Sequence, residues 1–382
     1  MRSTFVAAAL AGIYIHIPFC RKACTYCDFH FSTGLQTVPL LVKALAEEIY
    51  RRAAYLAERD LQSIYIGGGT PSLLQEKELA IIFEQLYKHF AWDKSAELTI
   101  EANPDDISSS MLDTWKKFGI NRISLGLQSF NDEELRWMNR AHTAAQGLDA
   151  VKRAQDTGFE NISLDLIYGS RFQDDNSWAQ TLQTVIDLNV PHISSYNLTV
   201  EQKTLLYHNI KHGIEPPVNE TLSARQFNSM SDFLADNGFL HYEVSNFARP
   251  GREAVHNSNY WKQKPYLGIG PSAHSFDGAS RQWNVRNNLQ YIKALQEGGN
   301  FSEREELTVK DRYNEYILTR LRTMWGCDMR EIEENFGAGA LSHFKKGIKL
   351  KGGLFITQNN VVTLSKEAKL LADGLASDLF LL

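Results

Sequence analysis

Cysteine is scarce in this chain, and its distribution excludes a disulfide-stabilised fold. Only four cysteines occur in 382 residues, and three of them lie within eight positions, which is not the spacing of a disulfide framework. Long apolar runs are also missing, since none approaches the roughly 20 residues that a membrane-spanning helix needs. Charge is balanced, with a formal net charge of −5 and 22% charged residues. The composition therefore lacks the basic footprint of a nucleic-acid-binding protein. It fits an intracellular, enzyme-like protein of two domains, or of one large and one small domain.

The three clustered cysteines are Cys20, Cys24 and Cys27, spaced CxxxCxxC directly after an apolar stretch that ends at Pro18. Thiolates at this spacing can each hold one iron of a cubane [4Fe–4S] cluster, and such clusters usually have four cysteine ligands. A set of three leaves the fourth iron open to a small molecule. The pattern therefore predicts a reactive iron–sulfur site rather than a store of electrons.

A zinc site is the alternative interpretation of the same cysteines. Structural zinc has four ligands in a closed tetrahedron, and the fourth ligand would then come from Asp28, His30 or His16. The remaining cysteine, Cys327, lies far along the chain in the string Trp-Gly-Cys-Asp-Met. There we expect a buried, small hydrophobic side chain.

Short apolar segments alternate with helical ones through the first half of the chain. We predict strands at Ile13–Ile17, Ser63–Ile66, Glu97–Glu101, Arg122–Leu125, Asn161–Leu166 and His192–Ser195. We predict helices at Pro39–Glu58, Glu76–His89, Ser108–Phe118 with Ser108 as N-cap, Asp132–Met138, Ala144–Thr157 and Trp178–Leu188. This alternation implies a parallel α/β sheet with helices outside it, either doubly wound or curved into a partial barrel. In both folds ligands bind at the C-terminal ends of the strands.

Polar residues fall at these strand ends. Glu101 ends the third strand, Gln128 follows the fourth, Asp165 lies in the fifth, and Arg140 lies on the connection between the fourth and fifth. An ionised carboxylate among apolar strand residues is costly unless it is paired or liganded. The two carboxylates therefore predict either structural ion pairs, with Arg122, Arg140 or a lysine, or one shared ligand pocket.

The cysteine spacing resembles that of the radical S-adenosylmethionine (radical SAM) enzymes, in which SAM chelates the open iron. The resemblance favours the six-stranded partial barrel and implies a reducing partner such as flavodoxin or ferredoxin. In that family a glycine stretch after the second strand binds the SAM amino group, which implicates Gly68, Gly69 and Thr70 here. It places Tyr14 near the cluster. It assigns the methionyl, ribose and carboxylate groups of SAM to Glu101, Gln128, Arg140 and Asp165.

Several further strings occur together in one order and narrow the resemblance. They are Tyr-Ile-His-Ile-Pro-Phe-Cys at 14–20, Tyr-Cys-Asp-Phe at 26–29, Ile-Gly-Gly-Gly-Thr-Pro-Ser at 66–72, Glu-Ala-Asn-Pro at 101–104, Asn-Arg-Ile-Ser-Leu-Gly-Leu-Gln-Ser-Phe at 121–130 and Leu-Gly-Ile-Gly at 267–270 followed by Ala-His at 273–274. From about residue 12 to its C-terminus the chain is similar to the oxygen-independent coproporphyrinogen oxidase group. That group contains a coproporphyrinogen III dehydrogenase branch and a HemW-type heme chaperone branch.

Three features discriminate between the two branches. The dehydrogenase branch has a further cysteine two residues after the cluster motif, where this chain has Phe29. The string His-Asn-Ser-Asn-Tyr-Trp at 256–261 resembles the HNxxYW motif of the chaperone branch, in which the histidine is implicated in heme binding. Imidazole is a normal axial ligand of heme iron, and aromatic rings suit a flat macrocycle, although a lone loop histidine is more often a surface hydrogen-bonding residue. The chain also lacks the longer N-terminal extension of the dehydrogenase branch.

The resemblance therefore favours a heme chaperone that binds heme near the cluster through His256 and delivers it to recipient hemoproteins. A coproporphyrinogen III dehydrogenase and a radical SAM enzyme with another substrate stay open. We expect a cytoplasmic protein that binds no nucleic acid and that associates peripherally with membrane-bound respiratory hemoproteins. Residues 1–10 mimic part of a secretory signal, but we interpret them as a frayed extension or a start-site artefact. Arg171 lies in a loop that departs from the family pattern, where it adds a cation for a heme propionate.

The C-terminal part is predicted to form a separate small domain. Helices are expected at Asp311–Met324, Met329–Phe336, Leu341–Lys349 and Lys366–Phe380, and a hairpin at Leu354–Thr357 and Val361–Leu364 with an Asn359-Asn360 turn. We predict a radical SAM partial barrel over 1–245, a connecting segment with the His256 motif over 246–300 and a winged-helix-like domain over 301–382. Its lysines fit a solvated helix face, so we expect a lid or a protein-docking surface rather than DNA binding.

Overall fold

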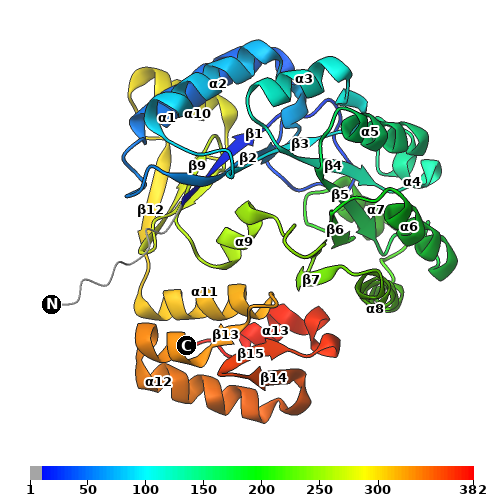
Figure 1. Cartoon of the computed structure of the whole chain (residues 1–382), viewed down its shortest axis with the longest axis vertical. Helices are drawn as coiled ribbons and strands as arrows, with labels where there is room; N and C mark the ends of the chain where they lie inside the picture. Colours follow the sequence, from blue (N-terminus) through cyan, green and yellow to red (C-terminus); the bar gives the residue numbers. More distant parts are fainter. Residues whose placement is uncertain (1–10) are drawn as a thin grey trace.

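A computed structural model describes residues 11–382, so the interpretation of residues 1–10 lies outside the described residues. Its central feature is a twelve-stranded sheet in the order β12-β11-β10-β9-β1-β2-β3-β4-β5-β6-β8-β7. Strands β1 to β6 are parallel, follow chain order and curve into an arc with helices on its outer side (Figure 1). The predicted six-stranded partial barrel is confirmed, with strands slightly longer than expected: β1 Ala11–Ile17, β2 Leu61–Gly68, β3 Glu97–Ala102, β4 Arg122–Gln128, β5 Asn161–Tyr168 and β6 His192–Asn197.

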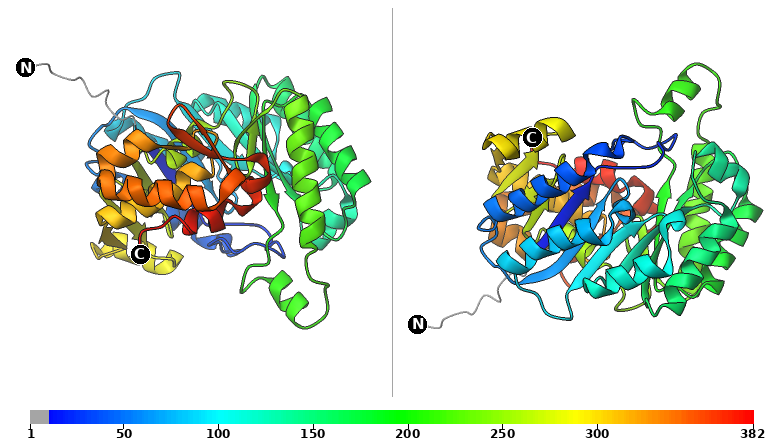
Figure 2. Two further views of the ribbon diagram at one scale, coloured as in Figure 1. Left: turned by 90° about the horizontal axis from the view of Figure 1, so that it is seen from below. Right: turned by 90° about the horizontal axis from the view of Figure 1, so that it is seen from above.

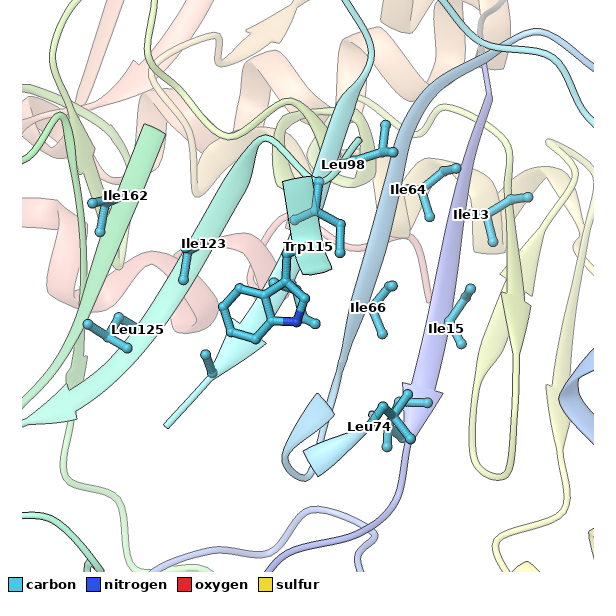
Figure 3. Close-up of a cluster of buried hydrophobic side chains, with 14 of the residues drawn as sticks. Ile13, Ile15, Ile64, Ile66, Leu74, Leu98, Trp115, Ile123, Leu125 and Ile162 are labelled. Carbon is cyan, nitrogen blue, oxygen red and sulfur yellow. The ribbon is translucent and has the colours of Figure 1, made fainter. Parts of the chain in front are cut away.

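Side chains along these strands alternate between an apolar outer face and a polar inner face, as the two-residue period of a strand dictates. The outer face is buried against the surrounding helices and includes Trp115 of the third helix. Figure 3 shows this layer through Ile13, Ile15, Ile64, Ile66, Leu98, Ile123, Leu125 and Ile162. On the inner face the register sets Tyr14 beside Tyr65 and Ser124 beside Ser163. The apolar layer therefore holds the barrel together, and the interior is left for polar side chains.

The helices between these strands begin close to their predicted positions, but the first ends at Arg51 and not at Glu58, because the chain turns over residues 52–57. Ser108 caps its helix as expected, because the Met111 N–H donates to its Oγ at 3.2 Å. The sixth helix begins earlier than predicted, because the Asp174 carboxylate accepts from the Ser177 N–H at 2.7 Å and caps the helix there. The bounds are α1 Val38–Arg51, α2 Glu76–His89, α3 Ser109–Lys117, α4 Asp132–Trp137, α5 Ala144–Asp156 and α6 Asp175–Asp187.

The chain after β6 completes the sheet on both edges. Strand β8 pairs antiparallel with β6, and β9 pairs in parallel with β1. The segment 246–300, expected to be a connection, is thus built into the main sheet, and the domain division at residues 245 and 300 stays a prediction. The elements are α7 Leu205–Lys211, α8 Glu220–Asp236, β7 Leu240–Glu243, β8 Asn246–Ala248, α9 Val255–Trp261, β9 Tyr266–Ile269, β10 His274–Phe276, β11 Ser280–Asn284, α10 Asn288–Glu297 and β12 Ser302–Glu306.

The C-terminal part has a core of its own around the buried Cys327, as expected. The Asn359-Asn360 turn is confirmed, since both residues have positive φ (52° and 68°) as a tight hairpin turn requires. The predicted second and third helices are confirmed as two helical stretches within α12, separated at Gly337, whose φ of 88° and ψ of 167° are not helical. One expectation was wrong, because the last helix begins with a 3₁₀ stretch over Lys366–Leu371. The elements are α11 Val309–Leu321, β13 Cys327–Asp328, α12 Met329–Leu350, β14 Phe355–Gln358, β15 Val361–Leu364 and α13 Ala372–Ser377.

This small unit packs against the open side of the barrel, next to α9 (Figure 1). The Val244 N–H donates to the Arg322 carbonyl at 3.0 Å, and the Met324 N–H donates to the Tyr242 carbonyl at 2.9 Å. Among the described helices, none is long and apolar enough to cross a membrane. Figure 2 shows α7 projecting from the body on the same side as the loop that follows β1.

Candidate functional site

The three predicted cysteines lie on the loop after β1, at the C-terminal end of the barrel strands. We call residues 20–27 the cluster loop, and all three of its cysteines are half-buried. The base of the loop is fixed to the sheet, because the Cys20 N–H donates to the Ser32 carbonyl at 3.1 Å and the Gly69 N–H donates to the Ile17 carbonyl at 2.9 Å. The loop therefore stands directly over the ends of β1 and β2.

A buried carboxylate ties the cluster loop to the neighbouring strand ends. Asp106 accepts from the Arg21 guanidinium at 2.8 Å through one oxygen and from the Ser72 hydroxyl at 2.7 Å through the other. On the other side of the loop, the Asn139 amide donates to the Ala23 carbonyl at 2.7 Å. The conformation of the loop is therefore set by residues far away in sequence.

Arg140 is the predicted residue that reaches the cysteines directly. One guanidinium nitrogen lies 3.5 Å from the Cys24 sulfur, and the other donates to the Asn103 side chain at 2.7 Å and to the Gly126 carbonyl at 2.8 Å. Its Nε is buried without a partner among the described residues. The guanidinium thus places a fixed positive charge beside the Cys24 sulfur, and the spare donor points to an acceptor supplied by a ligand.

The donor set of the loop fits an iron–sulfur cluster, because three half-buried thiols lie on one short loop and each can hold one iron. Burial raises the pKa of Cys27 to about 11 and also raises that of Cys20, so loading with iron must release protons.

The glycine turn after β2 is packed against the cluster loop. Gly68 has a φ of 115°, which side-chain-bearing residues rarely adopt. A Cβ on Gly69 would lie 2.6 Å from the Phe19 carbonyl oxygen and 3.0 Å from the Cys20 sulfur. The turn therefore leaves bare backbone beside the cysteines, which suits close approach of a ligand at this point, and Thr70 is buried next to it.

Glu101 supports this turn from the inner face of the barrel. Its carboxylate accepts from the Tyr65 hydroxyl at 2.7 Å and from the Gly68 N–H at 2.9 Å. Burial raises the pKa of Glu101 to about 7, and these hydrogen bonds oppose that rise. Within the described residues Glu101 forms no ion pair with Arg122, which lies 3.8 Å from Glu97 instead. The structural ion pair that we considered for it is absent there.

The remaining strand-end residues face the same interior. Asp165 accepts from the Ser124 hydroxyl at 3.0 Å, and burial raises its pKa. Gln128 has a φ of 64° at an irregularity in β4, and a Cβ on Gly126 would lie 3.0 Å from the Gln128 amide nitrogen and 3.3 Å from an Arg140 nitrogen. Strained backbone held in this way is common where a side chain is aimed at a ligand.

Tyr14 is linked through His16 to His30, which lies just after the cluster loop, and the sequence did not reveal this link. The Tyr14 hydroxyl lies 2.9 Å from His16 Nδ1, and His16 Nε2 lies 3.0 Å from the His30 carbonyl. Because a carbonyl only accepts, Nε2 is the donor and Nδ1 accepts from the hydroxyl. Burial lowers the pKa of His16 to about 4, which agrees with a neutral ring. The strand alternation that places His16 inward is the signal that could have identified it.

The structure places the His256 ring inside the barrel, 5.2 Å from the Tyr65 ring and 6.4 Å from the Tyr14 ring, and heme binding near the cluster stays a prediction. The Nδ1 of His256 lies 2.9 Å from the Ser63 hydroxyl, and the Glu97 carboxylate accepts from its backbone N–H at 2.9 Å. Ser63 and Glu97 stand at the N-terminal ends of β2 and β3, whereas the cluster loop follows the C-terminal end of β1. Figure 1 shows α9, which begins at Val255, within the arc of the sheet.

Phe29 and Arg171 are the two remaining residues that the sequence singled out. Phe29 is 68% exposed, so its ring is presented to solvent beside the cluster loop. Arg171 forms an ion pair with Glu215 at 2.6 Å, and its contact with a propionate stays a prediction.

The fold and the cysteine loop define a radical SAM protein, and residues 14–185 match the family model of the Radical SAM superfamily. The heme chaperone HemW of Bacillus subtilis (strain 168) is 33% identical over 370 residues, which cover 95% of this chain and 97% of that protein. The heme chaperone HemW of Escherichia coli (strain K12) is 32% identical over 82% of each chain. The chain belongs to the HemW family, and this membership implies a [4Fe–4S] cluster and SAM as cofactors.

A solved structure agrees with this placement at the level of fold. Coproporphyrinogen III oxidase (HemN) from Escherichia coli, described as a radical SAM enzyme, superimposes with a TM-score of 0.85 at 26% identity. The match covers 97% of this chain and 90% of that chain, so it includes the C-terminal unit.

Proposed function

We propose that this protein binds heme and delivers it to recipient hemoproteins. The observation that carries the proposal is the likeness to curated heme chaperones, at 33% identity across 95% of the chain for one of them. Phe29 supports it, because a phenylalanine supplies neither a thiol nor a metal ligand where the dehydrogenase branch has a cysteine. Its exposed ring is instead suited to contact with an apolar cargo or with a partner.

Cys20, Cys24 and Cys27 are the proposed cluster ligands in this function. A [4Fe–4S] cluster with bound SAM supplies one-electron chemistry when it is reduced, here by a donor such as flavodoxin or ferredoxin. Arg140 holds a positive charge beside the Cys24 sulfur. The residues proposed to contact SAM are Tyr14, Gly68, Gly69, Thr70, Glu101, Gln128, Arg140 and Asp165.

His256 is the proposed axial ligand of the heme cargo. Its Nδ1 is engaged with Ser63, so Nε2 is the nitrogen left for iron, and a hydrogen bond at the other ring nitrogen is usual for metal-bound histidine. Burial lowers the pKa of His256 to about 4, which keeps the ring neutral and able to ligate. The His256 ring lies 6.4 Å from the ring of Tyr14, a proposed SAM contact, so heme held by His256 would share the barrel interior with the cofactor.

A coproporphyrinogen III dehydrogenase is the second candidate, and the TM-score of 0.85 to the solved oxidase favours it. Fold likeness alone does not fix an activity, because one fold supports many sites. The two candidates differ in what happens to the tetrapyrrole, which makes them separable by product analysis.

The deciding experiment is anaerobic and uses the full chain after cluster reconstitution. One half of the sample receives SAM, reductant and coproporphyrinogen III, and the other half is titrated with hemin and then mixed with apomyoglobin as a recipient. We expect tight hemin binding, transfer to the recipient and no decarboxylated product. Formation of protoporphyrinogen, or an absence of hemin binding, would overturn the chaperone proposal.

A further inference from the structure

Residues 203–214, which we call the α7 lobe, project from the body beside the cluster loop (Figure 2). The lobe is fixed to that loop on one side, because the Leu206 N–H donates to the Thr25 carbonyl at 2.8 Å and Leu206 packs with Met138 and Tyr26. Its other side is open, with Leu205 55% exposed and Ile214 64% exposed. A projecting lobe that turns large apolar side chains to water is a docking surface when a matching occupant exists.

Two exposed histidines stand on this open side. The rings of His208 and His212 lie 4.1 Å apart, one helical turn from each other. His212 Nδ1 lies 2.7 Å from the His208 carbonyl oxygen. Because a carbonyl only accepts, Nδ1 carries the proton and Nε2 carries the lone pair. His212 is thus already in the tautomer that metal-ligating histidines adopt when a backbone carbonyl orients them.

The charges around His208 and His212 indicate which ligand the two histidines could bind. Lys203 and Lys211 flank the histidines, and no acidic residue occurs between positions 202 and 214. The two ammonium groups would repel a bare divalent cation, and of the two acidic residues that flank this segment, Glu201 and Glu215, the second is paired with Arg171. A heme offers iron to the imidazole, an apolar plane to the exposed leucine and isoleucine, and two propionates to the lysines.

We infer that the α7 lobe is a second heme site, with His212 Nε2 as the iron ligand. The inference rests on the proposed function, since it takes heme to be the cargo. It adds a heme-binding position at the cluster end of the barrel. His208 is a positioning residue, because its carbonyl fixes the His212 tautomer and its ring packs against that of His212.

The test measures how many equivalents of hemin the full chain binds. Binding is monitored by absorbance and by the low-spin electron paramagnetic resonance signal of imidazole-ligated ferric heme. His212→Ala is expected to remove one equivalent and to lower affinity at that site by at least about tenfold, since even loss of a second-layer partner costs about 10–100-fold at metal sites. His256→Ala should leave the α7 equivalent intact. His89→Ala, at the end of α2, is the matched control and should bind as the wild type does. Iron-free protoporphyrin IX should show no dependence on His212.

The outcomes separate this inference from the proposed function. Unchanged hemin stoichiometry in His212→Ala, with loss in His256→Ala, would overturn the α7 site and leave the chaperone proposal standing. Wild-type protein that binds no hemin would overturn both. Zn²⁺ bound through His212, without any change in hemin binding on its removal, would show that the pair serves a metal ion and would also overturn the inference.

Discussion

Glu101 provides a pH test of the barrel interior that does not depend on any ligand. Burial raises the pKa of its carboxyl from 4.5 to about 7 in the folded chain. A raised carboxyl pKa means that the fold favours the neutral form, so stability is fully present below pH 4.5 and is lost as the pH rises towards 7. Each pKa unit corresponds to about 1.4 kcal/mol. The shift therefore corresponds to about 3 kcal/mol, which we reduce to about 1–3 kcal/mol because the side chain is only half-buried.

Glu101→Gln removes this pH-dependent cost and keeps the side-chain shape. The amide can still accept from the Tyr65 hydroxyl, but its NH₂ group would face the Gly68 N–H, so the variant loses one hydrogen bond at every pH. The free energy of unfolding of the variant, relative to wild type, should therefore rise by about 1–3 kcal/mol between pH 4 and pH 8.

The assay is urea unfolding of the cluster-free protein at a series of pH values, with Glu84→Gln on the exposed face of α2 as the matched control. The control should follow the wild-type pH profile throughout. A stability difference between Glu101→Gln and wild type that stays constant from pH 4 to pH 8 would refute the reasoning, because Glu101 would then titrate alike in the folded and unfolded chains.

Three further predictions concern the cluster loop, the glycine turn and the core. Asp106→Asn should weaken the contact of Asp106 with Arg21 and Ser72 by about 1–3 kcal/mol. The variant should therefore lose iron to a chelator faster than the control Asp105→Asn, whose side chain is exposed. Equal rates of iron loss would show that Asp106 does not hold the cluster loop. Gly69→Ala should abolish cluster retention, because the added Cβ would lie 2.6 Å from the Phe19 carbonyl oxygen. The control Gly339→Ala places its Cβ in open space and should be neutral or stabilise the fold by up to about 1 kcal/mol. A normal iron content in Gly69→Ala would disprove the close contact. Trp115→Ala should cost about 3–5 kcal/mol in urea unfolding, and a cost below about 1 kcal/mol would mean that this layer is not packed as described.

The strands and the cysteine loop could be predicted because their signals are local. Ile13 and Ile15 alternate with Tyr14 and His16, and such a period-two pattern identifies a strand without knowledge of the fold. The sequence left Glu101 with two interpretations, an ion pair or a ligand pocket, and the structure gives it hydrogen bonds to Tyr65 and Gly68 instead of an ion pair with Arg122.

The contacts that shape the site could not be predicted, because they join segments distant in sequence. Arg21 meets Asp106 across 85 positions, and Ser63 meets His256 across 193. Neither pair leaves a spacing that a helix or strand period would reveal. The position of α9 depends on how the chain returns after β8, and local propensity carries no information about that path.

The two ends of the barrel are therefore built from different parts of the sequence, and this bears on how likeness to other proteins should be used. The cluster loop and the glycine turn, from residues 20–70, occupy the C-terminal ends of the strands, whereas His256 comes from a late segment and occupies the opposite ends. Tyr65 joins the two ends, because its hydroxyl donates to Glu101 at 2.7 Å and its ring centroid lies 5.2 Å from that of His256. A barrel shared with a coproporphyrinogen oxidase therefore does not by itself fix the chemistry at either end. The residues that decide between conversion and carriage of a tetrapyrrole are those that differ between the branches, and Phe29 and His256 are where experiments should begin.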